Sequence, residues 1–190
     1  EGIPNPNLNS TQFNKTAPDF RQKGNSLFNI DNDGNPATNL WALATDYDVA
    51  NLTLVADFAQ FDPVHLIGTI DYAENQGFDR NEILKRTLGN VEPDATGYLA
   101  RLAVGYPVIA DRQDWQAYVA YRYLERDAVP DAFADSDFHL GGTNNKGFII
   151  GGMYGLAKNT WLSARWMSSD QISGLPLSID VLQVDLNAKF

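Results

Sequence analysis

Residues 178–190 read SIDVLQVDLNAKF, and the last nine of them alternate strictly between apolar and polar side chains. From Leu182 onward, Leu182, Val184, Leu186, Ala188 and Phe190 are apolar, and every residue between them is polar. A period of two predicts a β-strand with one apolar and one polar face. The apolar face of such a strand meets either the core of a soluble protein or the hydrocarbon of a membrane. A terminal phenylalanine tends to fray in water, so its place here favours lipid.

The same alternation recurs in segments of roughly the 9–11 residues that a tilted membrane strand requires. The segments are 40–48, 51–60, 64–73, 96–106, 115–124, 147–156, 160–168 and 178–190. We therefore predict an all-β fold, an antiparallel transmembrane β-barrel with about eight strands in this chain. The first two segments nearly touch, so 40–60 could instead form one long bent strand. A short strand near 27–30 and one or two helical turns within 81–88 are also expected.

The chain divides into two regions by composition. Residues 1–38 are rich in Asn, Pro and Gly and are expected to form an extended or loop segment. Residues 39–190 carry the barrel strands, with long loops at about 75–95 and 125–146. The other connections are shorter. Long loops on one side and short turns on the other are typical of outer-membrane barrels, whereas a soluble β-sandwich, the alternative, has no reason to sort its loops.

Charge and composition exclude several functions. The chain has 14 Lys and Arg against 24 Asp and Glu, a net charge of −10, which disfavours nucleic-acid binding. The absence of cysteine excludes disulfides, thiolate zinc sites and cysteine nucleophiles, and two histidines are too few for a His-rich metal site. No uncharged apolar run approaches the roughly 18 residues of a transmembrane helix. No cofactor is expected.

Four stretches resemble the C-terminal part of the bacterial putative porin family. They are LIGTIDYAENQGFD (66–79), AYRYLERDAVPDAFADSDFHLGGTNNKGF (120–148), MYGLAKNTWLSARWM (153–167) and LSIDVLQVDLNAKF (177–190). The resemblance runs from about residue 40 to the end. It implies a β-barrel channel in the outer membrane of a Gram-negative bacterium, passing small solutes or ions by diffusion without catalysis. Phe190, with Leu186, Val184 and Leu182, is similar to the signal read by the barrel-insertion machinery.

Members of such families usually have about sixteen strands, so this chain is expected to be the C-terminal half of a larger barrel. The expected partners are then outer-membrane lipid, the insertion machinery, and the remaining strands from the same or another chain. Porins of this type are commonly trimeric, which makes a homotrimer one assembly to test. The alternative is a small closed barrel, whose lumen side chains would fill. Such a barrel would act as an anchor or as a binding surface through its long loops.

The polar faces of the predicted strands carry charges of opposite sign in different regions. The candidate pore-lining residues are Asp46, Asp57, Asp71, Arg101, Arg122, Arg165 and Asp185. Carboxylates on one arc facing guanidinium groups on another would set a transverse field that filters solutes by charge. The same groups could instead only neutralise one another in a packed lumen.

Two loop motifs are weaker candidates. Residues 29–40 place Asn29, Asp31 and Asp33 at calcium-loop positions, but the twelfth position is a leucine rather than the required glutamate, which favours an Asx-rich turn. Residues 135–139 bring Asp135, Asp137 and His139 together, as an outer-membrane hydrolase would require. No oxyanion hole accompanies them, which favours a solvated acidic loop.

Overall fold

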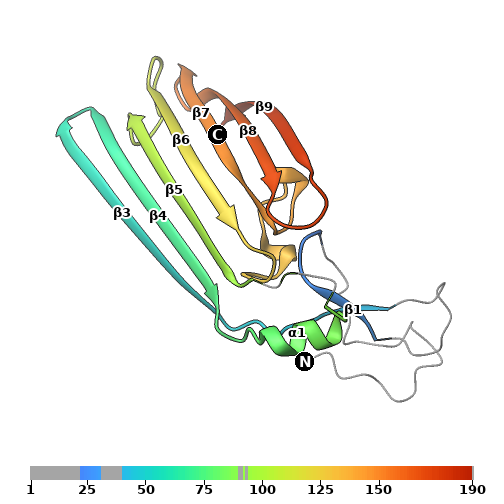
Figure 1. The fold of residues 1–190 in the computed structure, drawn as a ribbon. Helices are drawn as coiled ribbons and strands as arrows, with labels where there is room; N and C mark the ends of the chain where they lie inside the picture. The colour runs from blue at the N-terminus through green and yellow to red at the C-terminus, as the bar shows by residue number, and fades with distance from the viewer. Residues whose placement is uncertain (1–21, 31–39, 90–91, 93, 190) are drawn as a thin grey trace.

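The computed structural model describes residues 22–30, 40–89, 92 and 94–189, and these form two antiparallel sheets (Figure 1). Strands β1 (Leu27–Asn29) and β2 (Trp41–Leu43) make a small two-stranded sheet. The large sheet contains seven strands in sequence order: β3 (Val49–Phe61), β4 (Val64–Asn75), β5 (Thr96–Gly105), β6 (Trp115–Leu124), β7 (Asn145–Ala157), β8 (Thr160–Gln171) and β9 (Ser178–Ala188). The predicted all-β antiparallel architecture is therefore confirmed. The sheet is open, with β3 and β9 at its two edges.

The large sheet contains seven neighbouring strands rather than the predicted eight, because the first predicted strand is not part of it. Segment 40–48 contributes only β2, which pairs with β1, so 40–60 is neither two barrel strands nor one long bent strand. The side chain of Asn75 explains the break. Its amide donates to the Asp46 carbonyl at 2.8 Å, and its oxygen accepts from the Asp48 amide at 3.0 Å. These bonds satisfy the backbone before β3 in place of a neighbouring strand.

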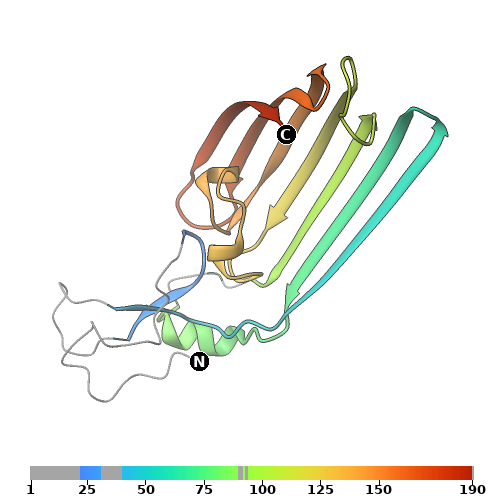
Figure 2. The same cartoon turned by 180° about the vertical axis from the view of Figure 1, so that it is seen from behind.

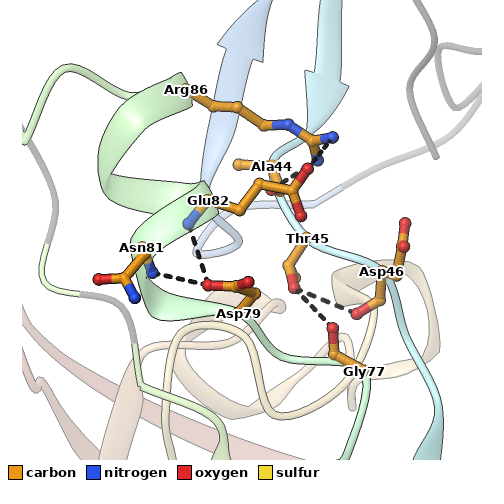
Figure 3. A network of polar contacts seen from close by, with 8 residues as sticks. All are labelled: Ala44, Thr45, Asp46, Gly77, Asp79, Asn81, Glu82 and Arg86. Carbon is orange, nitrogen blue, oxygen red and sulfur yellow. Dashed lines mark hydrogen bonds and ion pairs between the residues drawn. The ribbon is translucent and has the colours of Figure 1, made fainter.

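The expected short strand and helix are both present. The strand is β1, and the helix is α1 (Arg80–Arg86) in the β4–β5 connection. Asp79 caps α1, accepting from the amides of Asn81 at 2.8 Å and Glu82 at 3.1 Å. Figure 3 shows how the helix attaches to the segment after β2: Arg86 pairs with Glu82 and donates to the Ala44 carbonyl at 2.9 Å.

The large sheet has two different faces, as the alternation predicted. The outer face is defined here by the rung Leu182, Trp166, Ile150, Val119 and Leu102, which are successive cross-strand neighbours. Large apolar side chains on this face are exposed along its whole width, from Leu54 at 57% to Leu182 at 72%. The inner face is the opposite one, and it carries most of the charged side chains of the strands; the exceptions, near the ends of strands, are Glu74, Lys146, Asp170 and Asp180. A soluble protein rarely leaves an apolar patch of this extent in water.

The connections are sorted between the two ends of the sheet. The β3–β4, β5–β6 and β7–β8 turns lie at one end, with the C-terminus. The described parts of the long connections 76–95 and 125–144 lie at the other end with β1 and β2, which we call the loop end. None of the helices in the described residues is long and apolar enough to cross a membrane.

The β6–β7 loop does not extend away from the sheet, because its middle packs on the inner face. The loop contains two short 3₁₀ helices, η3 (Asp131–Phe133) and η4 (Phe138–Leu140), and η4 lies against β8 and β9 (Figure 2). The Phe138 side chain is fully buried against Ala120, Ile149 and Met167. Burying a phenylalanine contributes roughly 1.5–3 kcal/mol, which helps to hold this part of the loop on the sheet.

Candidate solute-facing surface

The inner face collects six of the seven predicted pore-lining residues. Asp57, Asp71, Arg101, Arg122, Arg165 and Asp185 all lie on strands of the large sheet and share one face by register. Asp46 is the exception and corrects the prediction. It lies between β2 and β3, where its carbonyl binds the Asn75 side chain, so no strand carries it to the inner face.

The acidic side chains gather on β3 and β4. The Asp71 carboxylate accepts from the Thr53 hydroxyl at 2.6 Å and from the Asn51 amide at 2.9 Å. Asp57 lies 2.8 Å from Nδ1 of His65, which therefore points to the inner face. These carboxylates occupy the edge of the sheet, and their partners are neutral donors or a histidine. This arc therefore retains negative charge.

The basic side chains lie on β5, β6 and β8, and they have different partners. Arg101 donates to the Gln116 amide oxygen at 2.9 Å, and its guanidinium carbon lies 4.4 Å from the centre of the Tyr118 ring. Arg165 donates to Gln183 at 2.8 Å and pairs with Asp137 at 2.5 Å. Arg122 lies over the ring of Phe138 at 5.1 Å. The face thus has an acidic and a basic region, as a transverse field requires.

The β6–β7 loop supplies residues that the sequence reading did not place on this surface. Asp137 was expected to lie in a solvated loop, but its carboxylate binds Arg165 on β8. The buried His139 ring lies 3.0 Å from the Ser169 hydroxyl. No contact joins His139 to Asp135 or Asp137 within the described residues, so the hydrolase arrangement is not assembled there. The sequence signal was the apolar Phe138 between polar neighbours, which predicts a buried anchor.

Burial lowers the pKa of His139 below its ordinary value of 6.5, and nearby Lys23 acts in the same direction. A histidine whose pKa is lowered in the docked loop binds a proton more readily when the loop is undocked. Docking of η4 is therefore strongest above about pH 6.5 and weakens as the pH falls below that value. We expect proteolysis of the 125–144 loop to accelerate on acidification from pH 7.5 to 5.5.

The control for this prediction is His139→Asn. Asparagine tolerates the positive φ of 56° at this position, and its side-chain amide can donate to the Ser169 hydroxyl, which itself donates to the Ile179 carbonyl at 3.0 Å. Loop proteolysis in this variant should lose the change with pH. If the variant and the native protein accelerate equally on acidification, His139 is not the titrating group.

A buried polar network ties residues 22–30 to the β6–β7 loop. The Asp127 carboxylate accepts from the amide of Ser26 at 2.8 Å, its hydroxyl at 2.5 Å and the hydroxyl of Tyr47 at 3.1 Å. The Asn25 amide donates to the carbonyls of Arg126 at 2.6 Å and Val129 at 2.9 Å. Burial raises the pKa of both Asp127 and Tyr47. The network fixes the base of the loop that lies on the inner face.

The remaining predicted residues fall partly outside the described residues. Asp31, Asp33 and Phe190 lie outside them, and the Asn29 side chain accepts from the Leu40 amide at 3.0 Å. Leu182, Val184 and Leu186 lie on the outer face of β9, with exposed fractions of 58% to 72%. No group of three acidic or histidine side chains suited to a metal ion occurs in the residues that the structure describes.

The fold and its two faces define an all-β protein with an apolar outer face and a charged inner face. A family model with the description "Putative porin" matches residues 3–190, nearly the whole chain. The chain therefore belongs to this porin family, which confirms the resemblance seen in the sequence. Membership implies a porin-like role and an outer-membrane location. No curated protein and no solved structure shows significant similarity to the chain.

Proposed function

We propose that the chain forms part of the wall of a water-filled outer-membrane channel through which small solutes or ions diffuse passively. The observation that supports this most strongly is the division of one continuous sheet into an exposed apolar face and a charged face. Lipid would cover the outer face, and water and solutes would meet the inner face.

A wall with free edges cannot remain in a bilayer, because unpaired backbone groups are too costly in hydrocarbon. Within the described residues no strand pairs with the outer edge of β3 or of β9. We propose that further strands, from the same protein or another chain, close the barrel. Seven strands closed on themselves would leave little room for water, since about eight already fill their lumen with side chains. The same proposal includes insertion of the protein by the barrel-assembly machinery and its assembly into a homotrimer.

The proposed channel filters by charge through the field between the acidic and basic arcs. Replacing Arg101 and Arg122 together by glutamine should shift ion selectivity toward cations, whereas Asp57→Asn with Asp71→Asn should shift it toward anions. Arg165 is left unchanged because its loss would also release Asp137 and the loop. Reversal potentials in planar bilayers under a salt gradient measure both shifts.

The shifts should be larger at low salt, because the Debye length falls from about 30 Å at 0.01 M to about 3 Å at 1 M. Equal reversal potentials in both double variants and the native protein would contradict the proposed transverse field. A folded protein that never conducts would favour the small closed barrel, an anchor or binding surface built on its long loops.

A further inference from the structure

A cleft of about 350 Å³ opens on the inner face, between strands β3–β6 and the β6–β7 loop. We call it the Arg122 cleft. Leu99, Val129 and Phe133 form apolar parts of its wall, and Arg122 and Asp71 lie among them. The Phe133 side chain is a large aromatic group and is 85% exposed, whereas Phe138 and His139 of the same loop are buried. The cleft therefore combines a cation with an exposed apolar surface.

Arg122 differs from the other two arginines of the inner face. Arg101 has the Gln116 oxygen as an acceptor, and Arg165 has the oxygens of Gln183 and Asp137. No hydrogen bond or ion pair joins Arg122 to any residue in the part of the chain that the structure describes. Its guanidinium carbon lies 5.1 Å from the centre of the Phe138 ring, and that ring covers one face of the group. The N–H groups at its edge are left to bind another molecule.

The nearby carboxylates of the protein form their hydrogen bonds with other groups, although the charge of Asp135 attracts Arg122. Asp137 binds Arg165, Asp71 accepts from Thr53 and Asn51, and Asp135 accepts from the Asp137 amide at 2.9 Å. A partly buried guanidinium without an acceptor is unfavourable, because its hydration is reduced and no hydrogen bond from the described residues replaces it. A carboxylate from solution matches the planar fork of an arginine with two parallel hydrogen bonds.

We propose that the Arg122 cleft binds organic monocarboxylates with an apolar body as they pass along the inner face. The carboxylate pairs with Arg122, and the apolar body packs against Phe133 and Val129. Asp71 and Asp135 also line the cleft and repel a second negative charge, which disfavours dicarboxylates. The inference rests on the proposed channel function, because it gives that channel a solute class.

Equilibrium dialysis with radiolabelled benzoate tests the proposal on the purified protein folded in detergent micelles, with empty micelles as the blank. Native protein should bind benzoate with one site, and Arg122→Gln should weaken that binding by about tenfold or more, as the loss of a charge-assisted pair predicts. Arg101→Gln is the matched control, and its affinity should stay within about twofold of native. Succinate should compete less effectively than benzoate.

Phe133→Ala supplies a second test that does not depend on Arg122. Its side chain is exposed, so the substitution leaves the fold intact, and it should weaken benzoate binding while leaving the weaker binding of acetate unchanged. No benzoate binding by native protein, or equal losses in the Arg122 and Arg101 variants, would overturn the proposal. Because dialysis requires no ion current, benzoate binding in a protein that does not conduct would uphold the cleft and reject the channel.

Discussion

Asp127→Ala is expected to release residues 22–30 from the loop end of the sheet. Asp127 is completely buried and accepts three hydrogen bonds from Ser26 and Tyr47. Alanine leaves these buried donors without an acceptor, and each such group costs about 1–3 kcal/mol. We expect the docking of this segment to lose about 3–5 kcal/mol in total, since neighbouring losses do not add fully. Protection of the Ser26 amide against hydrogen exchange should fall at least about a hundredfold.

Two variants make this result interpretable. Asp127→Asn keeps one acceptor oxygen in nearly the same volume and should lose only part of the protection. Asp135→Ala removes an exposed carboxylate from the same loop and should leave exchange at Ser26 unchanged, because no contact joins the two residues. Native protection in Asp127→Ala would mean that the buried network does not hold residues 22–30.

Leu54→Arg is expected to disrupt assembly in the membrane, whereas Thr53→Arg, one residue earlier, is expected to be tolerated. Leu54 lies near the middle of β3 on the outer face, with 57% of its side chain exposed. Arginine on the lipid face near the midplane of a barrel costs about 2–4 kcal/mol. Thr53 lies on the inner face beside Asp71, which can pair with an arginine there. Urea titrations of both variants in lipid vesicles measure the difference in the free energy of unfolding.

The comparison uses neighbouring residues of one strand, so it separates the effect of the face from effects of strand position and charge. Equal losses of stability in the two variants would show that the outer face does not meet hydrocarbon.

The strands from β3 to β9 and their two faces were accessible from sequence because a period of two is a local property. Each strand from β3 to β9 alternates, and the register aligns the apolar residues of all seven. The prediction of a barrel strand at 40–48 was wrong because the structure of this segment depends on one side chain that is distant in sequence. Asn75 satisfies the backbone at Asp46 and Asp48, and nothing within 40–48 signals that partner.

The inner surface was predictable in its strands but not in its loop. Alternation placed Arg101, Arg122 and Arg165 on one face, yet it says nothing about where a loop of twenty residues folds. The contact between Asp137 and Arg165 joins positions 28 residues apart and depends on Phe138 finding the cluster at Met167. Long-range contacts of this kind require the tertiary structure. The unpartnered state of Arg122 could be recognised only after the partners of the other arginines were known.

The central claim is that the inner face of this sheet lines a conducting channel while the outer face meets lipid. The native chain contains no cysteine, so single cysteines along β9 can be modified without background. Gln183→Cys and Asp185→Cys lie on the inner face, and Leu182→Cys and Val184→Cys lie on the outer face. In planar bilayers, a charged thiol reagent should change single-channel conductance in the first two variants and leave it unchanged in the other two. Conductance changes at all four positions, or at none while the channel is open, would contradict the account.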